Sequence, residues 1–285
     1  MQSDFESKFG YDIEPGVTRE DLMILGAAAG SAKLRGGLPP GPDGLTVELV
    51  RALSQPQLDE LCALAATAFV ERPKSWNYIP VTLLPKGTAA TVFSNRLIAS
   101  QAVARKLYLA ALKKVILDDI CDFLDVHLGG VKPGDYAPAW ISRISVCIAK
   151  CKEWHVPLCL GSLDIARAFA IVNHDYLISA CHRLGVKDAW ICLITRELTL
   201  QNIDVMYQGA NLGSIRMNRG LVEGIPTSSL LLAIYLTYFW KQVRSHPVYV
   251  EHCMVLPAFN DSCSCQVDAA GWVDDWIVAS GTSEG

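Results

Sequence analysis

The sequence lacks a long apolar run, and this absence argues against a membrane-spanning protein. The longest such stretch, 230–240, is much shorter than the roughly 20 residues that a spanning helix needs, although the mean hydropathy is positive at +0.25. The N-terminus, MQSDFE, has no basic region followed by an apolar one, so no secretory signal peptide is expected. We therefore predict an intracellular protein without membrane contact, in either the nucleus or the cytoplasm.

The sequence also lacks the short motifs of several enzyme classes. It contains no phosphate-binding G-x-x-x-x-G-K-[ST] loop, no dinucleotide-binding G-x-G-x-x-G, no H-E-x-x-H zinc motif and no G-x-S-x-G elbow. Each of these motifs places backbone amides, metal ligands or a nucleophile where its chemistry needs them. Their absence disfavours the corresponding nucleotide-binding, metalloprotease and hydrolase classes.

The cysteines form no dense disulfide framework. Ten of them are spread over 285 residues, which favours buried, reduced thiols in an intracellular protein. One cluster, His252 and Cys253 with Cys263 and Cys265, contains metal-ligating residue types. Its spacing matches no standard zinc pattern, so zinc binding there is an open alternative.

Composition predicts a folded chain with an uneven charge distribution. Hydrophobic residues make up 51% and charged residues 19%, and Lys+Arg 25 against Asp+Glu 29 gives a net charge of −4. This is enough apolar material for one large domain or two subdomains. The segment 86–114 nevertheless contains no acidic residue and six basic ones: Lys86, Arg96, Arg105, Lys106, Lys113 and Lys114. Such a stripe fits either a phosphate-binding surface or a solvated helix face.

Hydrophobic periodicity predicts an α+β fold. Apolar residues recur at helical spacing in five segments: 19–32, 57–70, 99–120, 173–184 and 228–244. Short apolar or alternating runs predict five strands or strand pairs: 79–84, 156–164, 203–207, 213–217 and a hairpin over 271–280. Gly and Pro predict a loop over 36–44.

Two aspartate sites are set in apolar strands. Asp164 closes the first, and Asp274 and Asp275 lie within 271–278. A carboxylate buried near like charge is costly unless a cation neutralises it, and Mg²⁺ prefers carboxylate oxygens and bridges to phosphates. Neighbouring strand residues point to opposite faces, so both members of the pair can bind metal only if a tight turn relaxes the strand. A solvated Asp-Asp turn is the alternative.

The order of several segments resembles the reverse transcriptase domain of non-LTR (LINE-type) retrotransposons. The segment 163–174, LDIARAFAIVNH, is similar to the first palm motif of that family, 219–232, RGLVEGIPTSSLLL, to the second, and 273–275, VDD, to its A-D-D box. Shorter matches precede and separate them: PGPDG at 40–44, LPK at 84–86, RLIAS at 96–100 and GGVKPG at 129–134. Each match is weak alone, but all follow the family order.

The resemblance implies a right-hand polymerase with an antiparallel palm sheet backed by helices. It divides the chain into a helical lead-in (1–38), a fingers-like region (39–155) and a palm-like region (156–285). The chain reaches only ten residues beyond Asp275, so the thumb and later palm motifs are expected to be absent. That suggests a fragment or a decayed copy that is inactive in isolation.

The resemblance also assigns site residues. Asp164, Asp274 and Asp275 would be the catalytic carboxylates and bind two Mg²⁺ ions. Nucleotide contacts are implied for Lys86, Arg96, Arg167, Phe169, Glu223 and Gly224. Phe169 would exclude a 2′-hydroxyl and select deoxynucleotides, although it also fits a core position. The basic stripe 86–114 would face the template.

The implied activity is metal-dependent deoxynucleotidyl transfer, with an RNA template, a DNA primer and deoxynucleoside triphosphates as partners; protein partners stay unknown. Two departures weaken it: Glu223 replaces a family glutamine and adds negative charge, and Ala170 replaces an aspartate. A catalytically dead polymerase-fold remnant that at most binds nucleic acid is the alternative. A structural domain with a coincidental Asp-Asp turn is a third.

Overall fold

The computed structural model describes most of the chain, in eleven ranges: 18–30, 37, 40–85, 95–125, 127–132, 134–207, 209–252, 254–256, 265–267, 269–272 and 275–280. Lys86 and Asp274, two of the expected site residues, lie outside them, as do Cys253 and Cys263 of the possible zinc cluster. No helix within the described ranges is both long enough and apolar enough to cross a membrane.

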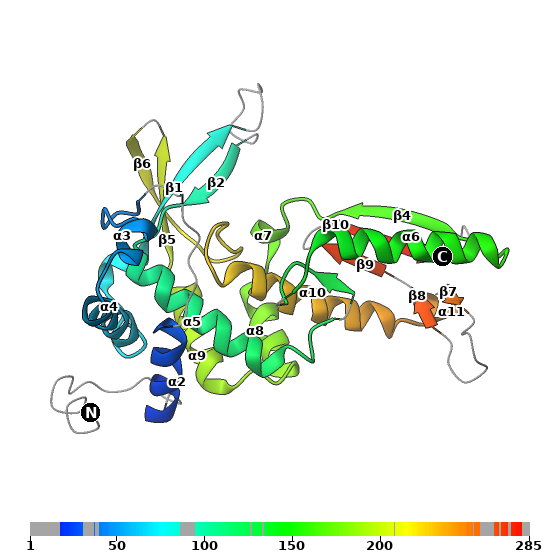
Figure 1. Ribbon diagram of the computed structural model, residues 1–285. Helices are drawn as coiled ribbons and strands as arrows, with labels where there is room; N and C mark the ends of the chain where they lie inside the picture. Colours follow the sequence, from blue (N-terminus) through cyan, green and yellow to red (C-terminus); the bar gives the residue numbers. More distant parts are fainter. Residues whose placement is uncertain are drawn as a thin grey trace.

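Strands form a four-stranded sheet at each end of an elongated molecule, with helices between them (Figure 1). The first sheet has the order β2-β1-β5-β6 and the second the order β3-β9-β10-β4. The strands of the first are β1 (Tyr78–Pro85), β2 (Asn95–Ala99), β5 (Asn202–Tyr207) and β6 (Ala210–Arg216). Those of the second are β3 (Leu128–Gly129), β4 (Cys159–Asp164), β9 (Ala269–Trp272) and β10 (Asp275–Ser280). A small sheet pairs β7 (Met254–Leu256) with β8 (Cys265–Val267).

The expected α+β composition is present, and the second sheet is largely antiparallel. In the second sheet β9, β10 and β4 are antiparallel, whereas β3 joins β9 in parallel through two residues. In the first sheet β1 pairs in parallel with β5. Because β5 and β6 lie beyond residue 155, the first sheet unites segments from both sides of that expected boundary.

Some helices lie between the two sheets and others beside them, such as α6 along the second sheet (Figure 1). The N-terminal and central ones are α2 (Arg19–Gly30), α3 (Val47–Arg51), α4 (Gln55–Thr67), the 3₁₀ helix η1 (Lys74–Asn77), α5 (Val103–Ile120) and α6 (Ala137–Glu153). The later ones are α7 (Ala168–Ile171), α8 (His174–Arg183), α9 (Asp188–Thr199), α10 (Ser228–Arg244) and α11 (Pro247–His252).

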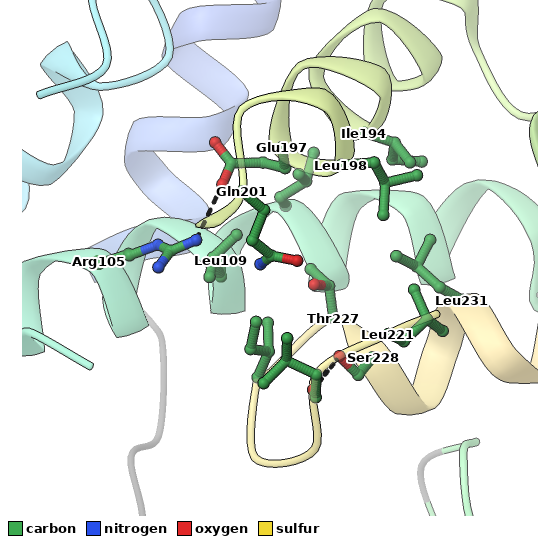
Figure 2. Close-up of a pocket in the computed structure, with 13 residues that line it drawn as sticks. Arg105, Leu109, Ile194, Glu197, Leu198, Gln201, Leu221, Thr227, Ser228 and Leu231 are labelled. Carbon is green, nitrogen blue, oxygen red and sulfur yellow. Dashed lines mark hydrogen bonds and ion pairs between the residues drawn. The ribbon is translucent and has the colours of Figure 1, made fainter. Parts of the chain in front are cut away.

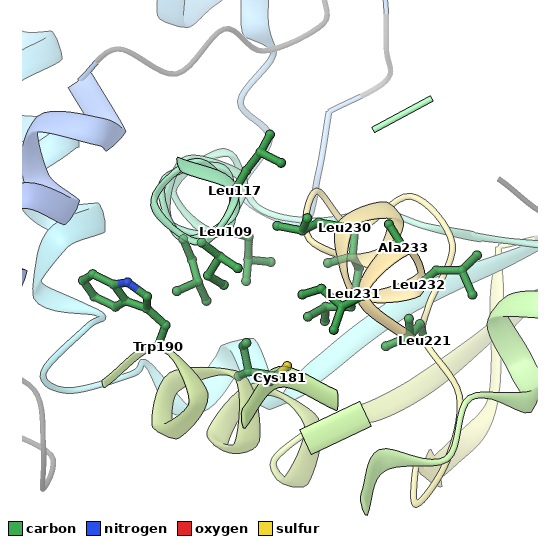
Figure 3. Close-up of a cluster of buried hydrophobic side chains, with 14 of the residues drawn as sticks. Leu109, Leu117, Cys181, Trp190, Leu221, Leu230, Leu231, Leu232 and Ala233 are labelled. Atoms are coloured by element: carbon green, nitrogen blue, oxygen red, sulfur yellow. The ribbon is translucent and has the colours of Figure 1, made fainter. Parts of the chain in front are cut away.

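The core forms around α5, which is buried on most of its circumference. Leu109 and Leu117 of this helix belong to the same cluster as Cys181, Trp190 and Leu231 from α8, α9 and α10 (Figure 3). Burying a leucine fully contributes roughly 1.5–3 kcal/mol, so these contacts hold α5, α8, α9 and α10 together.

The start of α5 is capped from a distance. Its own preceding residue, Ala102, offers no side-chain cap. The carboxylate of Asp43 instead accepts a 2.6 Å hydrogen bond from the Val103 amide, and a negative charge at a helix N-terminus is favourable. The expected loop around 40–44 is therefore also a structural support for the helix that begins sixty residues later.

Candidate functional site

Asp164 and Asp275 lie directly opposite each other. β4 and β10 are antiparallel, and their register pairs Asp275 with Asp164. Side chains of directly opposed residues leave a sheet on the same face, with their Cβ atoms about 4.5–5.5 Å apart. Both residues are exposed. Two carboxylates 111 residues apart in sequence are thus brought to one place.

The surrounding packing defines the face that carries the two carboxylates. Along β10, Ala279 alternates in step with Asp275 and packs against Cys151 of α6. Trp276 has the opposite parity and stacks on Trp240 of α10, with ring centroids 4.7 Å apart. The second sheet therefore lies between α10 on one face and α6 on the face of the carboxylates.

The first palm-like motif continues from β4 into a tight turn. Arg167 has φ +54°, a left-handed conformation that is strained for a residue with a side chain and that persists where the surrounding structure enforces it. The short helix α7 follows. Phe169 of α7 is half-buried and packs against the main core, so it is a core contact, and its role toward a nucleotide stays a prediction.

Backbone hydrogen bonds join the two palm-like motifs. The Leu221 amide donates to the Phe169 carbonyl, and the Gly220 amide donates to the Val172 carbonyl, each at 2.7 Å. The Gly220 carbonyl in turn lies 2.8 Å from Nε2 of His174. These contacts fix the segment 219–222 beside the turn that follows Asp164.

Gly220 permits this close approach. Its φ is +85°, and an added Cβ would lie 2.9 Å from the Ala170 carbonyl oxygen. A side chain would meet both backbone strain and a steric conflict. The glycine of the second motif is therefore explained by the turn against which it packs.

Glu223 and Gly224 contact the end of β2, a strand of the first sheet. Both are exposed, and the Ala99 amide at the end of β2 donates to the Glu223 carbonyl at 3.4 Å. Gly224 has φ +89° and lies beside Ala99. Arg96 is on the same strand, β2, so the expected nucleotide-binding segments around Arg96 and Glu223 are neighbours.

The expected basic stripe is not one surface. Arg105 is buried at 2% exposure. Lys113 is half-buried, its ammonium donates to the Ser229 hydroxyl at 3.1 Å, and burial lowers its pKa. Only part of the stripe is on the outside, as at Lys114 on α5. Helical periodicity explains the correction, because residues of one helix point in all directions.

Arg105 belongs to a buried ionic cluster that sequence reasoning missed. Glu197 of α9 pairs with Arg72 at 2.8 Å and with Arg105 at 3.4 Å. It also accepts a 2.9 Å hydrogen bond from the Tyr108 hydroxyl, which accepts one from Arg196 at 3.0 Å. Burial raises the pKa of Tyr108 and lowers that of Arg105. The only signal in the sequence was the presence of charged residues within otherwise apolar helical stretches.

This cluster borders a small internal cavity of about 20 Å³ (Figure 2). Arg105 and Glu197 lie at one side of it, and Leu221 and Leu231 contribute apolar walls. The Ser228 hydroxyl donates to the Val222 carbonyl at its edge. Its volume suits one water molecule, so it is a packing feature and no substrate site.

The donor atoms of the carboxylate pair suit a divalent metal ion. Asp164 and Asp275 supply hard oxygen ligands on one face, as Mg²⁺ requires. Like charges placed directly opposite each other are destabilising, and a divalent cation would relieve that repulsion. Within the described ranges no group of three or more acidic, His or Cys side chains forms a metal cluster. The pair therefore fits Mg²⁺ with much of its coordination left to water and substrate.

No protein-family model matches the sequence. Among solved structures, the chain is similar to apo telomerase from Candida tropicalis, with 12% identity and a TM-score of 0.50 over 81% of this chain and 45% of that one. Telomerase of the same organism in complex with a fragment of telomeric RNA gives 10% identity and a TM-score of 0.49 over 73% and 36%. The chain thus spans less than half the length of these telomerases. The likeness concerns the fold alone, which this chain shares with part of that apo telomerase.

Proposed function

We propose that this chain is the fingers and palm portion of a non-LTR retroelement reverse transcriptase, with fingers in 39–155 and palm in 156–285. The reaction would add deoxynucleotides to a DNA primer on an RNA template. The observation that carries the proposal is the register pair of Asp164 and Asp275. The likeness of the fold to telomerase supports it, as does the order of the sequence motifs along the chain.

In this proposal the protein mainly positions its substrates. Asp164, Asp275 and the neighbouring Asp274 hold the metal site. When bound there, Mg²⁺ ions would stabilise charge on the attacking and leaving oxygens of the phosphoryl transfer. The turn at Arg167 and the strand of Arg96 would face the triphosphate, together with Lys86, which lies outside the described residues. Phe169 would lie beside the sugar of the incoming nucleotide. The backbone hydrogen bonds from 220–221 to the α7 turn would hold it there.

Glu223 favours a second candidate, a remnant that binds nucleic acid without extending a primer. Its carboxylate is exposed at the position where the resembled motif has an amide. An ionised carboxylate accepts hydrogen bonds but donates none, and it repels a polyanionic substrate. This residue lowers the expected rate even if the metal site is complete.

Primer extension on an RNA template separates the two candidates. Mg²⁺-dependent incorporation that is lost in Asp164→Asn and Asp275→Asn and kept in Asp118→Asn, a matched change at an exposed aspartate of α5, would identify the enzyme. RNA binding without incorporation by any of these proteins would identify the remnant. A protein that neither binds RNA nor extends a primer would contradict both candidates.

A further inference from the structure

A second pocket lies away from the carboxylates and is lined by the turn at 42–43 and by residues at the beginnings of β1 and α5. Its volume is about 270 Å³, below the roughly 300–1,000 Å³ of sites for drug-sized ligands. Its walls include Asp43, Trp76, Tyr78, Pro80, Gln101 and Arg105. A pocket of this size suits one flat heterocycle.

Gln101 is the unusual residue of this pocket. It is only 2% exposed, yet neither its amide nitrogen nor its amide oxygen has a hydrogen-bond partner among the described residues. Buried polar groups are normally paired, and each unpaired one is destabilising. The Gln101 side chain therefore holds an unused donor and an unused acceptor beside the pocket, and a ligand that offers both could pair with them once the side chain turns toward it.

The charges in the pocket disfavour an anion. The carboxylate of Asp43 already occupies the N-terminus of α5 through its bond to Val103. Arg105 supplies the opposite charge, and its Nε atom also lacks a partner among the described residues. Because Arg105 is already paired with Glu197, its charge does not offset that of Asp43. A phosphate would meet the Asp43 charge, whereas a neutral polar ring would not.

Aromatic side chains offer a stacking surface. Trp76 is buried, whereas Tyr78 is 53% exposed at the pocket rim. Pro42 and Pro80 add flat apolar walls. Exposed aromatic rings beside hydrogen-bonding groups are how proteins capture unpaired bases of single-stranded nucleic acid. Glutamine binds a base edge through its donor and acceptor together, as in its bidentate contact with adenine.

We propose that this pocket captures one unpaired nucleobase of a single-stranded nucleic acid, stacked at Tyr78 and read by the Gln101 amide. The inference rests on the proposed function for the presence of a template strand. It assigns that strand a contact at the junction of β1 and α5, remote in sequence from Asp164.

The test uses the full chain and short single-stranded RNAs in which one uridine is replaced by photoreactive 4-thiouridine. We expect the crosslinked peptide to contain Trp76 and Tyr78. Tyr78→Ala should weaken RNA binding about tenfold, within the range of base-aromatic stacking, and Tyr78→Phe should keep it because the ring remains. Gln55→Ala, at an exposed amide of α4, is the control and should bind normally.

Gln101→Met should change stability and RNA affinity in opposite directions, which a purely structural residue would not do. The change keeps the side-chain length and removes two unpaired buried polar atoms, so the Tm should rise. At the same time RNA affinity should fall about tenfold, as expected for the loss of a paired base contact. A lower Tm together with unchanged affinity would overturn the proposal.

The outcomes also separate this proposal from the proposed function. Crosslinks elsewhere, with primer extension intact, would refute the pocket and leave the function standing. Crosslinks at Trp76 and Tyr78 without any primer extension would support base binding in the pocket and refute the proposed DNA synthesis. Normal RNA binding by both Tyr78→Ala and Gln101→Met would show that the pocket takes no base, and a protein ligand would then be its remaining occupant.

Discussion

Glu197 is a single buried carboxylate that two arginines contact directly and a third reaches through Tyr108. The cluster joins α5 and α9 to the segment after α4. The intact cluster contributes little to the free energy of folding. Removing one partner is strongly destabilising, because it leaves a buried charge without a counter-charge.

We expect Glu197→Gln to destabilise the chain by about 3–5 kcal/mol. Arg72 and Arg105 would then lie at short range without a counter-charge. Urea denaturation measures the effect, with Glu60→Gln at an exposed site of α4 as the control. Equal midpoints for the two variants would show that solvent compensates these arginines.

The opposed carboxylates give a second prediction at this scale. Asp164→Asn removes a like-charge pair, so it should raise stability by about 0.2–1 kcal/mol without divalent cations. The wild-type chain should gain stability on adding Mg²⁺, because a ligand that binds only the folded state stabilises it, and the variant should gain much less. Thermal melting with and without Mg²⁺ measures both. A wild-type Tm that is indifferent to Mg²⁺ would argue against a metal site.

Gly220→Ala probes the bond between the two palm-like motifs. The new Cβ would lie 2.9 Å from the Ala170 carbonyl oxygen at a φ of +85°, so we expect a loss of about 1–3 kcal/mol. Gly161→Ala is the control, since nothing lies within 4 Å of its Cβ position. Comparable melting temperatures for the two variants would mean that the backbone at Ala170 shifts at little cost to accommodate the new Cβ.

At the scale of elements, α2 is anchored to the start of α9 by charge. Asp21 of α2 is fully buried and pairs with Lys187 while accepting bonds from Thr18. Burial alone would raise the pKa of Asp21, but the Lys187 ammonium and the Thr18 donors outweigh it and lower the pKa. A lowered pKa stabilises the fold above the ordinary value of 3.8, and that contribution is lost as the pH falls through the lowered pKa.

We therefore expect Asp21→Asn to lose less unfolding free energy than the wild-type chain as the pH falls below about 4. Lys187→Met should reproduce this flattening, because it removes the partner that lowers the pKa. Urea denaturation across pH 2–7 measures it. If the loss of unfolding free energy at low pH is unchanged in both variants, other groups cause the acid sensitivity.

Most elements could be predicted from their own sequence. The apolar helix 228–244 has the predicted bounds, and the helices at 173–184 and 57–70 are displaced by only a few residues. The predicted helix 99–120 begins late, at Val103, because 95–99 pairs as β2 with β1. The helices α6 and α9 were missed. Many apolar side chains of α6, including Ile141 and Val146, are exposed, so its pattern does not show one buried face.

The candidate site was predictable only as separate motifs. Asp164 and Asp275 could each be identified from local sequence, but their register depends on β4 meeting β10 across the sheet. The buried pairing of Arg105 with Glu197 depends on tertiary packing of α5 against α9, which periodicity alone does not encode. The partnership of Asp164 with Asp274 stays a prediction, since Asp274 lies outside the described residues.

At the scale of the whole molecule, an acidic chain is proposed to bind a polyanion. With a net charge of −4, binding must rest on local cations, so RNA affinity should fall steeply with salt as phosphate contacts release counterions. Lys114→Glu should weaken binding and flatten the salt slope. Lys113→Met should leave the slope unchanged, because the Lys113 ammonium is engaged by Ser229. Salt-independent binding would contradict this electrostatic account.

The pairing of β4 with β10 also sets an order of assembly. β4 and its partner are separated by 111 residues, counted from Asp164 to Asp275, so the intervening helices can fold before the strands meet. At a synthesis rate of roughly 5–20 residues per second, β4 waits about 6–22 s for β10 to leave the ribosome. During that interval Leu160 and Leu163, still 45% and 49% exposed in the finished fold, belong to an unpaired strand edge. The nascent chain is then open to chaperones and to aggregation, and this interval, more than the final stability, should limit the yield of folded protein.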